Sequence, residues 1–230
     1  MIKSFLIIIS FSTLLFSSQQ ILLVVADDFN TSHAKLECYE GNKLVCKDID
    51  VNLGFNGLGW GLGIVNLHQK KDDPIKHEGD KRAPAGVFKL SMLFGYDKHK
   101  NFKMPYLQAD NNLICVDDSN SKYYNKLIDF QTKEKSFEYM KRKDNLYALG
   151  IVVAHNAHAR PQRGSCIFLH IQRGKDIPTV GCTSMQESAI KSVASWLDKE
   201  KNPILIQIPK SAAQEIKKLY PTLKNSTLLL

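Results

Sequence analysis

The chain has 230 residues, and 43% of them are hydrophobic, which is enough for a packed core and excludes a disordered protein. Its 31 Lys and Arg residues outnumber 23 Asp and Glu residues, so the formal net charge is +8. A positively charged surface could bind nucleic acid, an anionic membrane or an acidic polymer. Because the basic residues are scattered and no nucleic-acid-binding motif accompanies them, a solvated positive surface is favoured, and no nucleic-acid partner is expected.

The N-terminus has the layout of a secretory signal peptide. One lysine precedes a largely apolar run, Phe5–Phe16, and two serines follow it. The run is shorter than the ~20 apolar residues of a membrane span. A longer uncleaved anchor is disfavoured because a Ser-Ser-Gln-Gln stretch separates this run from the next one. Cleavage near Ser18 is favoured over cleavage after Ala26, because Ile21–Ala26 makes a good first strand. We therefore predict a signal peptide over residues 1–18, export to the periplasm or cell envelope, and no stable membrane span after cleavage.

Short apolar or alternating runs separated by turn residues indicate a mainly β protein. Eight runs have this character: Ile21–Ala26, Ala34–Tyr39, Lys43–Leu53, Gly86–Leu93, Asn112–Val116, Tyr147–His155, Cys166–Ile171 and Ile204–Ile208. The turn residues between the second and third runs predict a hairpin. A glycine-rich stretch over residues 53–64 lacks the spacing of a phosphate-binding loop, and a bend around Trp60 is favoured.

Helical patterns are few. The best covers about Met185–Glu200, where apolar residues recur at helical spacing. Ser184 and Glu187 fit a capping box at its start. Weaker helical patterns cover Tyr123–Phe130, Ser136–Lys141 and the tail Ser211–Tyr220.

The chain has five cysteines, an odd number, so at least one thiol is free or pairs between molecules. Cys38 and Cys46 flank the hairpin turn and could form a bridge; two half-buried strand cysteines are the alternative. Cys115 and Cys166 lie in apolar surroundings and are interpreted as core residues. Cys182 differs because Gly, Thr and Ser surround it.

Residues 164–185 hold the strongest chemical signal. His170 ends an apolar strand, and Cys182 follows twelve residues later, directly after Gly181. A thiolate nucleophile and an imidazole base are the parts of a cysteine acyl-transfer site. The N-terminus of the predicted helix is expected to lower the thiol pKa and to supply N–H groups for an oxyanion hole.

Other histidines compete with His170 for a functional role. A histidine at a strand end is more often structural than catalytic, so spacing alone leaves both interpretations open. His155 and His158 could form a metal pair, but further ligands at metal spacing are missing from the sequence. An exposed loop with two polar rings is therefore expected there, and no metal site is predicted.

The segment 164–185 resembles the active-site segment of L,D-transpeptidase catalytic domains, the YkuD-type family. Glu78–Phe88 is similar to the family signature E-G-D-x-x-T-P-x-G-x-F. The likeness spans about Ile21 to Pro209. Three further stretches resemble a branch with compact single-domain members: Asn56–Gly61, Cys115–Asp118 and Tyr123–Asn125.

The resemblance implies a mainly β fold, an L,D-transpeptidase-like β-sandwich with a few short helices and one longer helix after the nucleophile. The catalytic domain would cover residues 19–209, and residues 210–230 would form a C-terminal extension. By position, Cys182 is the nucleophile and His170 the general base, and the N–H groups of Gly181 and Cys182 are oxyanion donors. The implied partners are peptidoglycan stem peptides, a donor tetrapeptide and an acceptor amine. Neither a cofactor nor a metal is implied.

The sequence departs from the family pattern at two positions. Val180 stands where many members have a histidine, and Ser184 stands where many have an arginine or asparagine. The donor carboxylate must then be bound from elsewhere. Four candidates for substrate binding are Arg173, Arg163, Arg160 and Tyr124.

Three alternatives to the transpeptidase interpretation remain open. An L,D-carboxypeptidase would use the same two residues with water as acceptor. A non-catalytic wall-binding module would keep the fold without the reaction. A secreted protein stabilised by a disulfide at Cys182 would have no free thiol.

Overall fold

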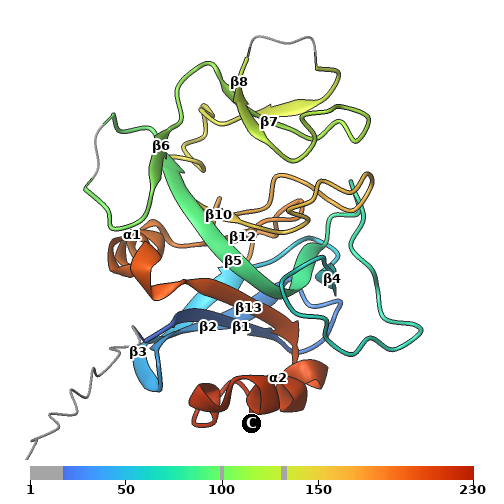
Figure 1. The fold of residues 1–230 in the computed structure, drawn as a ribbon, viewed down its shortest axis with the longest axis vertical. Coiled ribbons are helices and arrows are strands. Elements are labelled where there is room, and N and C mark those ends of the chain that lie inside the picture. The colour runs from blue at the N-terminus through green and yellow to red at the C-terminus, as the bar shows by residue number, and fades with distance from the viewer. Residues whose placement is uncertain (1–17, 99–100, 131–133) are drawn as a thin grey trace, which may run out of the picture.

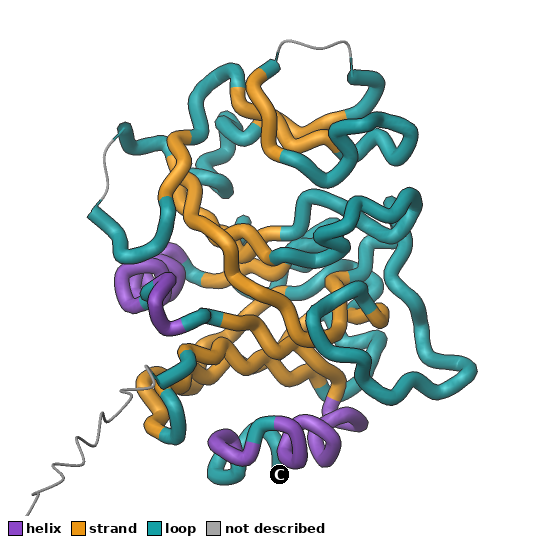
Figure 2. Tube along the Cα trace, in the orientation of Figure 1, coloured by secondary structure: helices purple, strands orange, loops and turns teal. Residues whose placement is uncertain are grey.

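The computed structural model describes residues 18–98, 101–130 and 134–230. Residues 1–17, most of the predicted signal peptide, lie outside the described residues. Within the described ranges, no helix is long and apolar enough to cross a membrane. Figure 2 shows a molecule of strands and long loops with little helix.

Eight strands close into a barrel in which strand directions are mixed (Figure 1). In order around the barrel they are β1 (Gln20–Ala26), β2 (His33–Glu40), β3 (Lys43–Asn52), β12 (Thr183–Met185), β11 (Phe168–Ile171), β10 (Leu149–Val153), β5 (Ala83–Gly95) and β13 (Ile204–Pro209). β1 runs parallel to β13, and β11 runs parallel to β12. The mainly β prediction is thus confirmed.

The expected β-sandwich is wrong, because the sheet closes on itself. The closure depends on β5, which has 13 residues. Its first half pairs with β13 from Gly86 to Lys89, and its second half pairs with β10 from Leu90 to Gly95. One strand therefore joins both ends of the sheet, and the barrel has no free edge at this seam.

The C-terminal tail packs against the barrel. Helix α2 (Ala213–Leu219) confirms the helical pattern predicted for the tail, and it lies below β1, β2 and β13 (Figure 1). Ile216 and Leu223 are fully buried in the main core cluster. The Ser226 hydroxyl donates a 2.6 Å hydrogen bond to the buried carboxylate of Glu37. The run Ile21–Ala26 of β1 is apolar without alternation because the strand is covered on both faces.

The helix after Cys182 exists but begins later than predicted. Helix α1 covers Glu187–Trp196, with Gln186 as its N-cap and no side-chain capping bond. The predicted capping box is therefore wrong. Ser184 instead belongs to β12, where it pairs with His170 on β11 and with Asn52 on β3. Pairing within the sheet therefore places in a strand the residue that the local sequence pattern predicted as the helix cap.

Two further predicted helices are also wrong. The segments 123–130 and 136–141 contribute strands β8 (Leu127–Asp129) and β9 (Phe137–Tyr139), which flank β7 (Leu113–Val116) in a separate small sheet. This sheet lies above β10 and β12 in Figure 1. Pairing with β7 supplies a non-local partner that the local pattern cannot reveal. The remaining strands are β4 (Leu58–Trp60) and β6 (Tyr106–Gln108).

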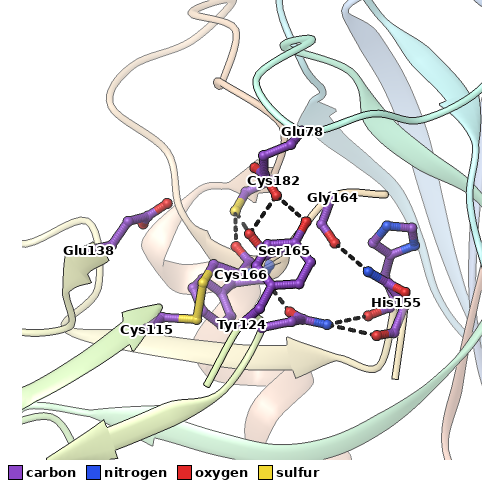
Figure 3. Close-up of a disulfide and its surroundings, with 12 residues drawn as sticks. Glu78, Cys115, Tyr124, Glu138, His155, Gly164, Ser165, Cys166 and Cys182 are labelled. Carbon is purple, nitrogen blue, oxygen red and sulfur yellow. Dashed lines mark hydrogen bonds between the residues drawn. A yellow bond between two sulfur atoms is a disulfide. The ribbon is translucent and has the colours of Figure 1, made fainter. Parts of the chain in front are cut away.

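Four of the five cysteines form disulfides. Cys38 and Cys46 face each other across β2 and β3 and are bonded. Cys115 and Cys166, interpreted as core residues, are bonded as well, and this expectation is corrected. Their bond ties the small sheet to the segment before β11, beside Cys182 (Figure 3). All five cysteines lie in the described ranges, and Cys182 alone keeps a thiol.

An aromatic cluster supports the barrel wall between β5, β10 and β11. The rings of Phe94, Phe168 and Tyr147 contact one another edge to face, with centroids 5.0 to 5.7 Å apart. Gly150 makes room for Phe94, because a Cβ at Gly150 would lie 2.2 Å from that ring. The cluster fixes Tyr147 next to His170.

Candidate functional site

Cys182 and His170 line the same pocket, whose volume is about 170 Å³. The other lining residues are Arg142, Leu146, Tyr147, Arg173, Ile177, Pro178, Thr179, Val180 and Ser184. The two residues that the sequence paired are thus brought to one cavity.

Neighbouring strands bring these two side chains together. β11 ends with His170 and Ile171, and β12 lies beside it in parallel, with Ser184 opposite His170. Cys182 directly precedes β12. The loop over residues 172–181 returns the chain from one strand to the other. Its end is fixed to the barrel, because Thr179 N–H donates to Leu53 O at 2.8 Å and Thr179 O accepts from Phe55 N–H at 2.9 Å.

The turn before Cys182 requires glycine. Gly181 has a φ of +149°, a conformation that residues with a Cβ rarely adopt. The Thr179 hydroxyl holds this turn, since it donates to Cys182 O at 2.6 Å and accepts from Gly181 N–H at 3.1 Å. The Gly181 N–H, predicted as an oxyanion donor, is therefore engaged by Thr179 in this structure.

His170 is buried, with 6% of its surface exposed, and its ring orientation is defined. Its Nδ1 lies 2.8 Å from Ile171 O. Because a carbonyl oxygen only accepts, Nδ1 must carry the proton, which leaves Nε2 as the acceptor in the neutral ring. Burial lowers the pKa of His170 to about 4, and the bond to Ile171 opposes this shift.

The Cys182 thiol is equally buried. Phe168 N–H donates to Sγ at 3.3 Å, and Sγ lies 3.5 Å from Cys166 O. Burial, together with the negative charge of Glu138, raises the pKa of Cys182 to about 12. The expectation that a helix N-terminus lowers this pKa is wrong, because β12 separates Cys182 from α1. The resting pair is thus a neutral thiol and a neutral imidazole.

Tyr147 and Glu138 are neighbours of the pair that sequence analysis missed. The Tyr147 ring contacts His170 edge to face at 5.2 Å, and its hydroxyl donates to Glu138 Oε2 at 2.7 Å. Glu138 lies on β9 opposite Cys115, so the small sheet places its carboxylate next to Tyr147. A local sequence pattern does not indicate such a contact, because it depends on the pairing of β7 with β9.

A Glu138→Gln variant is expected to lower the pKa of the Cys182 thiol, because it removes a nearby negative charge that disfavours the thiolate. The rate of iodoacetamide alkylation measured against pH would report the change, since Cys182 is the free thiol. A matched Glu134→Gln variant, on the loop before β9, should leave the profile in place. An unchanged or upward-shifted profile for Glu138→Gln would contradict the assigned role of Glu138.

Of the predicted substrate-binding residues, only Arg173 lines the pocket. Arg142, which sequence analysis did not select, lines it too, and its guanidinium stacks 5.1 Å from the Tyr147 ring centroid. Both arginines contact Asp144, at 2.6 Å from Arg142 and 3.5 Å from Arg173. The chain therefore places two guanidinium groups at the wall of this pocket.

The other three candidates lie away from the pocket lining. Arg163 Nε donates to Lys76 O at 3.3 Å, and the exposed Arg160 lines a different cavity. Tyr124 is buried, and its hydroxyl donates to the carboxylate of Glu78 (Figure 3). Ser165 donates to the same carboxylate at 2.7 Å. Glu78, the first residue of the signature, thus braces the segment that leads into β11.

His155 is buried, which corrects the expectation of an exposed loop. Its Nδ1 accepts from Leu62 N–H at 3.2 Å, and its Nε2–H donates to Arg163 O at 2.8 Å. Burial lowers its pKa to about 4. His158 is exposed. His155 is therefore a structural histidine that joins the Gly61–Leu62 backbone to the segment before β11.

The described ranges contain no group of three or more His, Cys, Asp or Glu residues that could hold a metal ion. Comparison of the chain with protein-family models, with curated proteins and with solved structures gives no match. The chemistry available in the pocket is that of a thiol, an imidazole with a free Nε2, a phenol and two guanidinium groups.

Proposed function

We propose that this protein is a cysteine-dependent acyl-transfer enzyme that acts on peptidoglycan stem peptides, as L,D-transpeptidases do. The observation that carries the proposal is the shared pocket of Cys182, the free thiol, and His170, whose Nε2 is available as a proton acceptor. The resemblance of Glu78–Phe88 and of the 164–185 segment to the family motifs supports the choice of substrate.

The first half-reaction forms a thioester. As Sγ of Cys182 bonds to the carbonyl carbon of the third stem residue, its proton passes to Nε2 of His170. The Cys182 N–H is the proposed oxyanion donor, joined by Gly181 N–H when that group leaves the Thr179 hydroxyl. The tetrahedral intermediate then expels the terminal D-alanine, whose amine takes the proton from His170.

The second half-reaction regenerates the thiol. An acceptor amine, or water, attacks the thioester carbonyl while His170 removes its proton, and the departing sulfur of Cys182 takes that proton back. An amine acceptor gives a cross-linked dimer, and water gives a tripeptide. Ile171 O keeps Nδ1 protonated throughout, so the same Nε2 serves every transfer.

Export to the periplasm or cell envelope is part of the proposal. The Cys38–Cys46 and Cys115–Cys166 disulfides support it, because disulfides persist in oxidising compartments. Peptidoglycan is found in the same compartment as an exported enzyme, so the location and the substrate agree.

Incubation of the purified, oxidised protein with a disaccharide tetrapeptide tests the proposal. Mass spectrometry should show a cross-linked dimer or a trimmed tripeptide, and a thioester adduct on the peptide that contains Cys182. The dimer identifies a transpeptidase and the tripeptide a carboxypeptidase. Binding of the tetrapeptide with neither product nor adduct would contradict the enzyme and favour a wall-binding module.

A further inference from the structure

Ser184 on β12 and Cys182, the residue directly before this strand, point to the same side of it. Side chains alternate along a strand, so residues two apart point to the same side. Thr183, between them, points inward, where its hydroxyl donates to Gln207 Oε1 at 2.7 Å. Ser184 lines the pocket of Cys182 and His170 and lies directly opposite His170 in the strand pair.

The hydroxyl of Ser184 is buried without a partner. Only 1% of the residue is exposed, and its Oγ has no hydrogen-bond partner among the described residues. Buried hydroxyl groups nearly always form a hydrogen bond, because a buried hydroxyl without one has lost its bonds to water and gained nothing in return. A ligand group that reaches Oγ would supply the missing bond.

The charge of the pocket indicates which kind of ligand group would bind to the Ser184 hydroxyl. Arg142 and Arg173 line the same pocket, and acidic residues are missing from its described lining. Both guanidinium groups contact the carboxylate of Asp144, so two positive charges and one negative charge stand at this wall and leave it cationic. A guanidinium binds a carboxylate through charge-assisted hydrogen bonds. A hydroxyl donor next to cationic groups therefore fits an anionic oxygen better than an amide or an amine.

We infer that the Ser184 hydroxyl is a substrate-binding group that donates a hydrogen bond to the terminal carboxylate of the acyl donor held beside Cys182. The inference rests on the proposed function and adds to it the residue that recognises the donor. It replaces the expectation from the sequence that the donor carboxylate is bound away from Ser184. Ser184 lines the pocket that holds Cys182, so a carboxylate bound to it would hold the adjacent scissile carbonyl near Sγ.

Thermal unfolding of two variants separates binding from structure. Ser184→Ala should leave the melting temperature unchanged or raise it, because no bond is lost. Thr183→Val, on the same strand, should lower the melting temperature, because its hydroxyl is bonded to Gln207. A loss of stability in Ser184→Ala equal to that in Thr183→Val would show a structural role and overturn the inference.

Calorimetric titration with the disaccharide tetrapeptide measures the contact without turnover, in protein that carries Cys182→Ala. Adding Ser184→Ala is expected to weaken binding about 10-fold, as for one hydrogen bond to a charged group. A donor with a C-terminal amide should bind both variants equally. Equal affinity of both variants for the free acid would overturn the inference alone. Failure of the Cys182→Ala protein to bind the tetrapeptide would overturn the proposed function as well.

Discussion

The Cys182→Ala variant is expected to form no thioester and to lose at least ~10³-fold of the turnover of the disaccharide tetrapeptide, because it lacks the attacking sulfur. The other four cysteines are bonded in pairs and offer no substitute thiol. Product formation followed by mass spectrometry measures the loss. A matched Cys38→Ala, Cys46→Ala variant removes two sulfur atoms that do not line the pocket and should keep its turnover. Turnover by Cys182→Ala would show that another group is the nucleophile.

His170→Ala is expected to lose a comparable share of turnover, because the thiol does not ionise unaided. Burial holds the thiol pKa far above neutral pH, at about 12, so very little of Cys182 is thiolate at rest. A base must therefore take the proton as sulfur attacks, and Nε2 of His170 is placed to do so. His158→Gln, on the exposed loop, is the control. If His170→Ala kept its rate while His158→Gln changed it, the base would be misassigned.

Local sequence was sufficient for the two central residues of the site but not for their surroundings. Cys182 and His170 stand in one short segment whose glycine turn and apolar strand are visible in the sequence. Tyr147 and Glu138 come from other segments, and Glu138 lies on β9, a strand of the small sheet whose local sequence predicted a helix. The high thiol pKa follows from burial, which spacing does not encode.

For the fold, too, the sequence predicted the local elements but not the pairing between distant segments. Alternating apolar runs identify most strands, because alternation reports one buried face. Closure into a barrel depends on β5 pairing with β13 along one half and with β10 along the other, a choice made between distant segments. Cys115 and Cys166 pair across 51 residues for the same reason. The predicted cap at Ser184 failed because β12 pairs with two strands at once.

Acidification from about pH 7.5 to about pH 5 is expected to lower the free energy of unfolding by about 2 kcal/mol for each of His155 and His170. Burial lowers the pKa of both rings to about 4 from an ordinary 6.5. Between pH about 6.5 and pH about 4, each of these two rings is protonated in the unfolded chain and neutral in the folded chain. Stability is therefore complete above pH about 6.5 and falls as the pH falls toward 4.

Other groups act outside this window or against it. The pKa of Asp144 is lowered to about 2 by Arg142, so the stability it contributes is present above the ordinary value of 3.8 and is lost only at lower pH. Burial raises the pKa of Glu138, so protonation of its carboxyl as the pH falls offsets part of the loss. The net result is still a loss, because two buried histidines oppose one carboxyl.

Urea unfolding at several pH values between about 7.5 and 5, with both disulfides intact, measures this slope. His170→Asn removes one titrating ring and should reduce the loss by about half, whereas His158→Gln should leave it unchanged. The comparison concerns the slope with pH, so any baseline destabilisation of a variant does not affect it. A flat profile in the unmodified protein would mean that the two rings accept protons while folded. The neutral imidazole that the proposed thiol–imidazole mechanism requires at rest would then be absent at mildly acidic pH.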